Sequence, residues 1–340
     1  MYGATVDLDD APLRALGIHR LEVPVPFFEA GGPANAFLIE DPDGRFTLFD
    51  TGVGTTDGIV ALRAHASEQG LDLGRLSRII VSHGHVDHFG NAQQLSEESG
   101  ARVFVHPLDR PKVLGHERFP DLLRRHRAYF AKLGVPLETL DLMQASSEKG
   151  ALRVRYVEDH RLGELRDGEV LHFRHFDARV MHCPGHTPGL IGLHAERPRL
   201  FFADDHLLVR VSPNPVLDFC QGEGRDKFRA LSRYIDSARR VRELELDAVL
   251  PGHGPAFHGH RSLIDDLFGF YEKRQAKLLA ALRQAPATPF ELLAAIWPRR
   301  DVPRLVLMLS EVLANLEVLE DRGLARVVEP DADVVRYAPS

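Results

Sequence analysis

Cysteine and long apolar runs are both scarce in this chain. Only Cys183 and Cys220 occur among its 340 residues, too few for a disulfide framework, so we expect a reducing, cytoplasmic location. No run of about 18 apolar residues is present, which argues against a membrane-spanning helix. The segment from Met1 to Asp10 is acidic and has no apolar core of the kind that signal peptides carry.

An excess of basic charge is also missing. The chain has 42 Lys and Arg against 49 Asp and Glu, a net charge of −7, whereas proteins that bind nucleic acid generally present a basic face. Segment 110–136 is the exception, with seven Lys and Arg against two acids and with apolar residues at helical spacing. A solvated helical face is the simpler interpretation. The alternative is a rim where Arg124 and Arg125 bind an anionic part of a substrate.

What the chain does have is a dense group of metal-ligand side chains. From Ser82 to His88 the sequence reads Ser-His-Gly-His-Val-Asp-His, and imidazole together with carboxylate suits zinc and its neighbours in the first transition row. A β-branched run over 76–81 precedes this motif and predicts a buried strand. A helix is expected to open at Phe89, so the motif lies on a strand-to-helix turn, where loops commonly carry functional residues.

Three later segments repeat the same order of apolar strand, tight turn and ligand-type side chain. His186 follows a strand over 178–181, Asp205 follows a strand that begins at Leu200, and His253 follows a strand that ends near Leu250. Glycine and proline surround the two histidines and allow the backbone to bend sharply around an ion.

Together with the earlier turn Asp50-Thr51-Gly52, these motifs resemble the metallo-β-lactamase fold hydrolases. The resemblance implies an α/β protein with a four-layer αββα sandwich and with metals at one edge between the sheets. It also implies a role for each motif residue: His83, His85 and His186 at a first metal, Asp87, His88 and His253 at a second, Asp205 bridging both, and Asp50 behind them, orienting the ligands. The register of the residues after Asp205 favours it over Asp204 as the bridge, and His206 is expected to be only a polar neighbour.

The resemblance further implies two Zn²⁺ ions, because His85 stands where di-iron relatives carry an acid. Iron and manganese remain alternatives, since affinity order alone does not decide the metal. The expected chemistry is attack by a hydroxide that bridges the two metals, with Asp87, Asp205 and Asp50 as the catalytic residues.

The expected substrate is a small-molecule ester, and a thioester is the first choice because a thiolate leaves without a strong general acid. A likeness to glyoxalase-II-like hydrolases points the same way, with coenzyme A or glutathione as the anionic handle. An endoribonuclease or other phosphodiesterase is the first alternative and a lactonase the second. Asn214 lies in a Pro-rich loop and either contacts substrate or belongs to a plain turn.

We expect a catalytic domain over residues 1–261 with a helical, basic insert at about 108–145, then a linking helix over 262–285. Residues 286–340 resemble the winged-helix tail of one subgroup of these hydrolases, with helices over 289–297 and 304–320 and strands over 323–328 and 334–337. This tail carries six Arg and nine Asp or Glu, which argues against DNA binding. Packing, homodimerisation or covering of substrate is the expected role.

Overall fold

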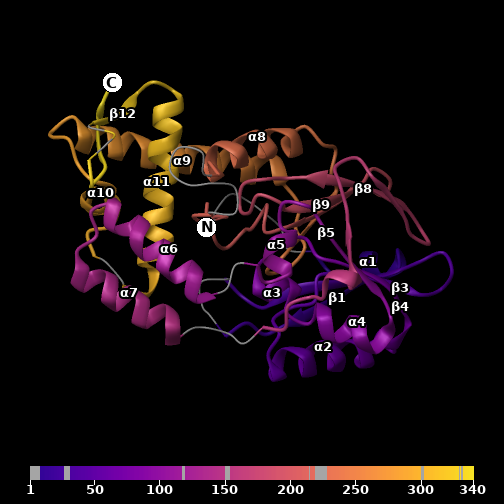
Figure 1. Cartoon of the computed structure of the whole chain (residues 1–340). Helices are drawn as coiled ribbons and strands as arrows, with labels where there is room; N and C mark the ends of the chain where they lie inside the picture. The colour runs from indigo at the N-terminus through magenta and orange to yellow at the C-terminus, as the bar shows by residue number, and fades with distance from the viewer. Residues whose placement is uncertain are drawn as a thin grey trace. The chain divides into compact units, whose positions relative to one another are not determined.

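The computed structural model describes residues 8–26, 31–116, 119–149, 154–213, 215–218, 228–299, 302–328, 330 and 332–340. The chain divides into two compact units. The first comprises residues 1–116, 152–213 and 236–265, and the second comprises 117–151, 214–235 and 266–340. Figure 1 labels their helices and strands. Residues 117–145 of the expected insert therefore belong to the same unit as the C-terminal elements, whereas residues 108–116 belong to the first unit. The domain boundary expected at residue 261 stays a prediction.

The first unit contains a six-stranded sheet in sequential order: β1 (Ile18–Val23), β2 (Ala34–Glu40), β3 (Phe46–Phe49), β4 (Leu76–Ile80), β5 (Arg102–Val105) and β6 (Leu162–Glu164). Strands β1 to β3 are antiparallel, and β3 to β6 run parallel. Parallel strands place their carboxyl ends along one edge of a sheet, which is the edge where ligands usually bind in α/β proteins.

A second, five-stranded sheet of the same unit has the order β11 (Ala248–Pro251), β10 (Leu200–Asp204), β9 (Ile191–Ala195), β8 (Asp177–His182) and β7 (Val170–His172). Strand β9 is antiparallel to both β8 and β10, and β10 is parallel to β11. Strands β8, β10 and β11 therefore run in the same direction and end at the same edge of the sheet.

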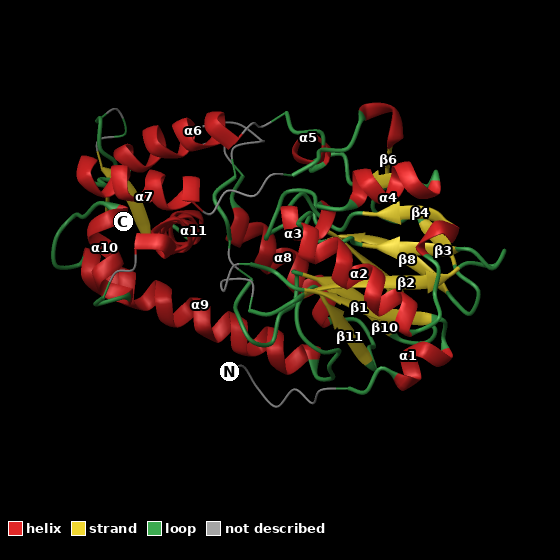
Figure 2. Cartoon of the chain, turned by 90° about the horizontal axis from the view of Figure 1, so that it is seen from below, coloured by secondary structure: helices red, strands yellow, loops and turns green. Residues whose placement is uncertain are grey.

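Successive side chains of a strand point to opposite faces of the sheet, and this alternation explains what packs on each face. Phe49 and Ile80 point into a core shared with the second sheet, where the Phe37 and Phe202 rings meet edge to face at 5.4 Å. The neighbouring residues Leu48 and Ile79 point the other way, into a core with the helices of the outer layer. These helices are α2 (Thr56–Glu68) and α4 (Ala92–Ser99), which lie beside the strands in Figure 2. The α/β sandwich expected from the sequence is thus confirmed.

Short helices complete the first unit: α1 (Ala11–Ala15), α3 (Val86–Phe89) and α5 (Arg110–Val113), with 3₁₀ turns at Leu73–Arg75 and Asp159–Arg161. The helix expected to open at Phe89 begins later, as α4 at Ala92, and the separate short helix α3 ends at Phe89, so that Asp87 and His88 lie within α3. Helices α8 (Ala230–Arg242) and α9 (His260–Leu282) run from one unit into the other. No helix among the described residues is long and apolar enough to cross a membrane.

The second unit is built around helix α11 (Leu305–Asp321). Helices α6 (Phe119–Lys132), α7 (Leu137–Lys149) and α10 (Pro289–Ile296), a 3₁₀ turn at Val302–Arg304, and the antiparallel pair β12 (Ala325–Val328) and β13 (Arg336–Pro339) complete it. The helices and strands expected in the tail are present. Nearly every residue of α11 from Met308 to Leu319 is buried, so it presents little surface of its own, and the winged-helix interpretation stays a prediction.

Candidate metal centre

Each predicted metal-site residue lies at or just beyond the carboxyl end of a strand in the first unit. Asp50 follows β3, the motif from His83 to His88 follows β4, His186 follows β8, Asp205 follows β10, and His253 follows β11. Because these strands run in matching directions within each sheet, their ends bring the five segments together although they are far apart in sequence.

Three imidazoles form the first group. Side-chain nitrogens of His83, His85 and His186 all lie within 4.8 Å of one another, and His186 Nε2 is 2.9 Å from His85 Nδ1. Loss of hydration and the adjacent His186 hold the pKa of His85 well below its usual value, and burial also lowers the pKa of His83. Both rings are therefore kept neutral, which is the state of imidazole that binds a metal.

Asp87, His88 and His253 form a second group with the same spacing. The Oδ2 atom of Asp87 lies 3.6 Å from His253 Nε2 and 3.8 Å from His88 Nε2. All three residues are at most 7% exposed. Two imidazoles and a carboxylate thus face a common point, from the β4 turn of one sheet and the β11 turn of the other.

The Asp205 carboxylate lies between the two groups. Its Oδ2 atom is 3.3 Å from His186 Nε2 and 3.7 Å from His88 Nε2, while its Oδ1 atom is 3.6 Å from His253 Nε2. One carboxylate therefore faces imidazoles of both groups, as a shared ligand would.

Asp204 and Asp50 approach the imidazoles from behind. Asp204 Oδ1 is 3.1 Å from His83 Nδ1, and Asp50 Oδ2 is 3.0 Å from His88 Nδ1. Asp50 Oδ1 also accepts a hydrogen bond from the Ser82 N–H at 2.7 Å. A carboxylate on Nδ1 leaves Nε2 of the same ring directed at the centre, which is how outer residues orient histidine ligands.

Both of these aspartates have left-handed backbone conformations, with φ of +62° at Asp50 and +48° at Asp204. Such conformations are unfavourable for residues other than glycine and tend to cluster at functional sites. Among the described residues only Arg199 shares this feature apart from glycines. The local strain at the ends of β3 and β10 thus coincides with the metal-site edge.

The buried carboxylates of the cluster require a compensating positive charge. Burial opposes a proton on His88, but the carboxylates of Asp204, Asp205 and Asp87 outweigh it and raise the pKa of His88 well above its usual value. Burial and the charge of Asp204 likewise raise the pKa of Asp50. Four nearly buried carboxyl groups, counting Asp87 and Asp205, stand here with no Lys or Arg ion pair among the described contacts, and buried charge of this kind needs compensation.

Buried side-chain atoms without a hydrogen-bond partner indicate where a positive ion would bind. Within the part of the chain that the structure describes, the buried atoms without a hydrogen-bond partner include His83 Nε2, His88 Nε2 and Asp205 Oδ1. Such orphaned atoms are rare in folded proteins, and all three belong to the clusters described above. Imidazole nitrogen and carboxylate oxygen are the donors that divalent transition metals take, so the residues present fit metal binding.

Several supporting residues had no role in the sequence-based prediction. Asn35 on β2 donates from Nδ2 to the carbonyls of Pro251 and Gly254, at 2.8 and 2.7 Å, and so fixes the turn that carries His253. Gly252 has no room for a side chain, because a Cβ there would lie 2.4 Å from Asp205 Oδ1. Asp109 connects two of the ligand-bearing turns. A strand-end glycine is visible in the sequence, but these long-range hydrogen bonds are not.

Two of the three residues predicted to bind substrate belong to the second unit. Asn214 is outside the described residues. Arg124 and Arg125 are on α6 of the second unit, where Arg124 pairs with Asp121 and the nearby Arg127 pairs with Asp141. The basic charge of α6 is thus partly neutralised by its own unit, and the substrate-binding role stays a prediction.

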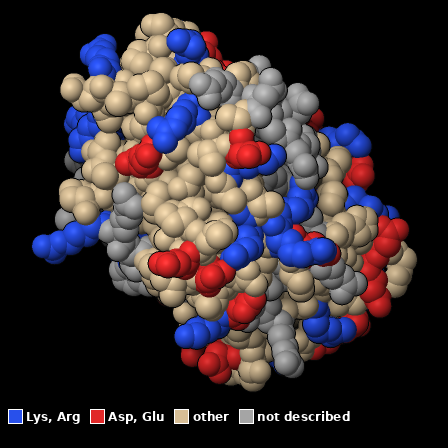
Figure 3. Space-filling model, turned by 60° about the vertical axis from the view of Figure 1, so that its left-hand side comes forward, with Lys and Arg blue, Asp and Glu red and all other residues tan. Residues whose placement is uncertain are grey.

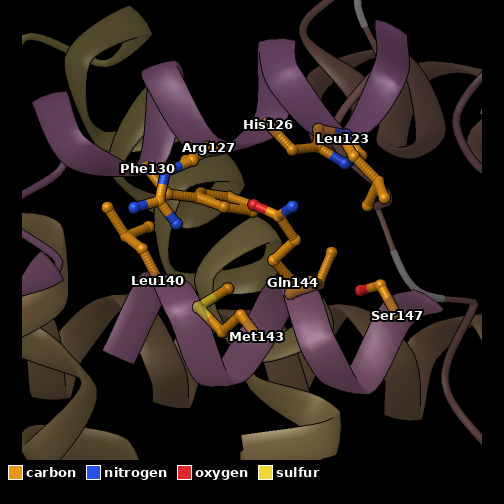
Figure 4. Close-up of a pocket in the computed structure, with 9 residues that line it drawn as sticks. Leu123, His126, Arg127, Phe130, Leu140, Met143, Gln144 and Ser147 are labelled. Atoms are coloured by element: carbon orange, nitrogen blue, oxygen red, sulfur yellow. The ribbon is translucent and has the colours of Figure 1, made fainter. Parts of the chain in front are cut away.

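A small pocket does lie between α6 and α7. Arg127 and Phe130 on one side face Leu140 and Met143 on the other (Figure 4). Its volume is about 20 Å³, enough for a water molecule or two. This pocket is therefore too small, as it stands, to hold the acyl chain of a substrate.

Residues 30–253 match the family model of the metallo-β-lactamase superfamily, and the chain belongs to this superfamily of metal-dependent hydrolases. The probable metallo-hydrolase YqjP of Bacillus subtilis is 27% identical over 303 residues, covering 88% of this chain and 91% of YqjP. The crystal structure of the metallo-β-lactamase family protein TTHA1429 from Thermus thermophilus matches with a TM-score of 0.77 at 28% identity, covering 95% of this chain and 99% of that one. The acyl-coenzyme A thioesterase MBLAC2 of Bos taurus is 25% identical over 251 residues, covering 69% of this chain and 78% of that protein.

Proposed function

We propose that this protein is a dinuclear zinc hydrolase that cleaves thioesters with an anionic handle, of the acyl-coenzyme A or acyl-glutathione type. The observation that carries the proposal is the position of Asp205, whose two oxygens face imidazoles of both groups at 3.3 to 3.7 Å. A single carboxylate so placed suits two metals held side by side rather than one.

The proposed ligands follow the two groups. They are His83, His85 and His186 at the first zinc, Asp87, His88 and His253 at the second, and Asp205 at both. Imidazole and carboxylate are ligands that zinc takes in proteins. Iron and manganese also bind such ligands and are the alternative metals. When bound, two zinc ions would supply Lewis acidity and bring the pKa of water toward neutrality.

The chain's own residues hold the reacting groups in place. The carboxylate oxygens of Asp87 and Asp205 accept hydrogen bonds and can hold a water molecule beside the centre with a lone pair free to attack. Asp50 and Asp204 keep the His88 and His83 rings fixed through Nδ1. Because these side chains are nearly all buried, little bulk water weakens the electrostatic interactions among them.

The reaction we propose forms a bond from the water oxygen to the carbonyl carbon and breaks the bond from that carbon to sulfur. One water proton passes to a carboxylate of the centre, the sulfur leaves as a thiolate, and that proton then passes from the carboxylate to the sulfur, giving a carboxylic acid and a thiol. A thiol has a pKa of about 8.5, so its thiolate leaves without a dedicated general acid. The name of MBLAC2, an acyl-coenzyme A thioesterase, supports the same substrate class.

The phosphodiesterase and lactonase alternatives have no specific observation in their favour. On the face drawn in Figure 3, Lys and Arg are interspersed with Asp and Glu, unlike the basic surface that RNA binding favours. Helix α11, which corresponds to the helix expected over 304–320, is buried along most of its length and offers little surface to a nucleic acid.

Turnover by the zinc-loaded protein on acyl-coenzyme A, acyl-glutathione, a lactone and single-stranded RNA tests the proposal. We expect release of free thiol from at least one thioester, lowered by more than about 100-fold in Asp205→Ala, since loss of a shared ligand should exceed the loss of an outer residue. Cleavage of RNA or lactone without thiol release would overturn the thioesterase proposal and favour the corresponding alternative.

A further inference from the structure

Asp109 is a buried acid whose carboxylate does not serve the helix that it begins. It stands at the N-terminal cap of α5 and is 0% exposed, yet its side chain makes no hydrogen bond to that helix. An aspartate at this position ordinarily accepts a hydrogen bond from its own first turn. Its oxygens are directed instead at two turns that are distant in the sequence.

Those two turns carry the first imidazole group. Asp109 Oδ2 accepts hydrogen bonds from the Gly84 N–H at 2.7 Å and from the Thr187 hydroxyl at 2.6 Å. Its Oδ1 accepts a third from the Gly189 N–H at 2.8 Å. Gly84 lies between His83 and His85, and Thr187 directly follows His186. One carboxylate thus ties the β4 turn of one sheet to the β8 turn of the other.

The backbone is closely packed around the Asp109 carboxylate. A Cβ on Gly189 would lie 2.6 Å from the Asp109 nitrogen and 2.8 Å from its side-chain carbons. Burial disfavours the charge of Asp109, but Lys112 and the Thr187 hydroxyl outweigh burial and lower its pKa. An ionised carboxylate with three donors is a strong, rigid connection.

The second group shares the β4 turn through Asp87 and His88, but its other supports are different. Asp50 contacts His88, and Asn35 holds the turn of His253, while the three hydrogen bonds of the Asp109 carboxylate reach neither of these elements. We propose that Asp109 is a positioning residue for the first metal only, setting the distance between the His83–His85 turn and His186. This inference rests on the proposed two-metal function but is independent of the substrate.

Zinc affinity measured in two single-site backgrounds tests it. His253→Ala leaves the first group complete, and His186→Ala leaves the second with its own two imidazoles. Adding Asp109→Asn preserves the shape of the side chain but turns one acceptor into a donor, which then faces an N–H or hydroxyl donor. We expect zinc affinity in the His253→Ala background to fall about 10- to 100-fold, as for other outer-residue changes, and affinity in the His186→Ala background to stay unchanged.

Equal losses in both backgrounds, or no loss in either, would overturn the inference. Asp41→Asn is the matched control, since Asp41 is a buried acid that accepts from Thr47 and Ser77 at the opposite end of the strands, and it should leave both affinities unchanged. If Asp109→Asn does not fold, Thr187→Val removes one of the three hydrogen bonds and must show a smaller loss confined to the His253→Ala background. Zinc binding needs no substrate, so absence of thiol release would count against the proposed reaction alone.

Discussion

At the scale of single residues, the centre is organised by which ring nitrogen meets a carboxylate. Asp50 and Asp204 take the Nδ1 atoms of His88 and His83, and Asp205 faces Nε2 atoms. The sequence placed two aspartates side by side at 204 and 205, and only the register of the following residues favoured the second. The structure distinguishes them, because Asp204 lies on the Nδ1 side of the His83 and His88 rings, whereas Asp205 lies on the Nε2 side of His88.

Replacing Asp50 by asparagine should weaken zinc binding without removing a ligand. The amide cannot offer two acceptors, so either His88 Nδ1 or the Ser82 N–H loses its partner. We expect the affinity for zinc to fall about 10- to 100-fold, measured by competition with a chromophoric chelator. Unchanged affinity in a folded Asp50→Asn protein would show that Asp50 does not orient the ligand.

Gly252→Ala should disturb the shared carboxylate directly. The added Cβ would lie 2.4 Å from Asp205 Oδ1 and 3.1 Å from His88 Cε1, so Asp205 must move. We expect retention of secondary structure by circular dichroism, with turnover lowered at least about 10-fold, as for other changes that displace ligands. Gly269→Ala in α9 is the comparison, since Gly269 has no left-handed φ and its Cβ would meet nothing within 4 Å. Equal activities of the two variants would contradict the account.

At the scale of elements, the pattern of strand followed by turn predicted where ligands emerge, but not what braces the turns. Apolar runs before His83, Asp205 and His253 mark strands because burial dictates their composition. Asp109 and Asn35 act on turns that are 25 to more than 200 residues away, and no local pattern encodes such pairs. Helix α11 shows the same limit of local patterns. Its periodicity predicts a single apolar face, but Asn315 is also fully buried and accepts a hydrogen bond from the distant Gln275.

The backbone at Gly54, after β3, lies in close contact with the backbone at Gly90, at the end of α3. A Cβ on Gly90 would lie 2.1 Å from the Gly54 nitrogen, so Gly90→Ala forces the segments apart. We expect the free energy of unfolding in urea to fall by about 1–3 kcal/mol.

The matched change is Gly269→Ala, inside α9, where a Cβ would meet nothing within 4 Å. Alanine favours a helix more than glycine does, so we expect stabilisation by about 0.5–1 kcal/mol. Effects of the same sign in both variants, read from the same urea titrations, would contradict this view of the two sites.

At the scale of the whole molecule, the order of the motifs along the chain predicted the fold class, because each motif marks one strand end of a known arrangement. The grouping of segment 117–151 with the C-terminal elements was not predicted. Its basic composition predicted a solvated helical face, with a substrate rim as the alternative, whereas Phe130, Leu133 and Leu140 pack in one core with α11. Composition reports what a segment exposes, and packing partners distant in sequence remain invisible to it.

Stability should fall as the pH drops below 6.5, in part through His106. Burial and the stacked His182 ring lower the pKa of His106 to about 4, so the unfolded chain binds more protons between these values. Its contribution is present above pH 6.5 and is lost toward pH 4, at most about 2 kcal/mol by pH 5. Urea unfolding at pH 7 and pH 5 should show a smaller pH dependence for His106→Gln than for the wild type. The exposed His160→Gln should behave like the wild type, and an identical pH dependence in all three would refute the assignment.

The central claim is that one carboxylate is shared by two metals, and anomalous diffraction from zinc-loaded crystals tests it most directly. The account predicts two zinc peaks on either side of the Asp205 carboxylate, one among His83, His85 and His186 and the other among Asp87, His88 and His253. A single peak, or two peaks of which one lies away from Asp205, would contradict it.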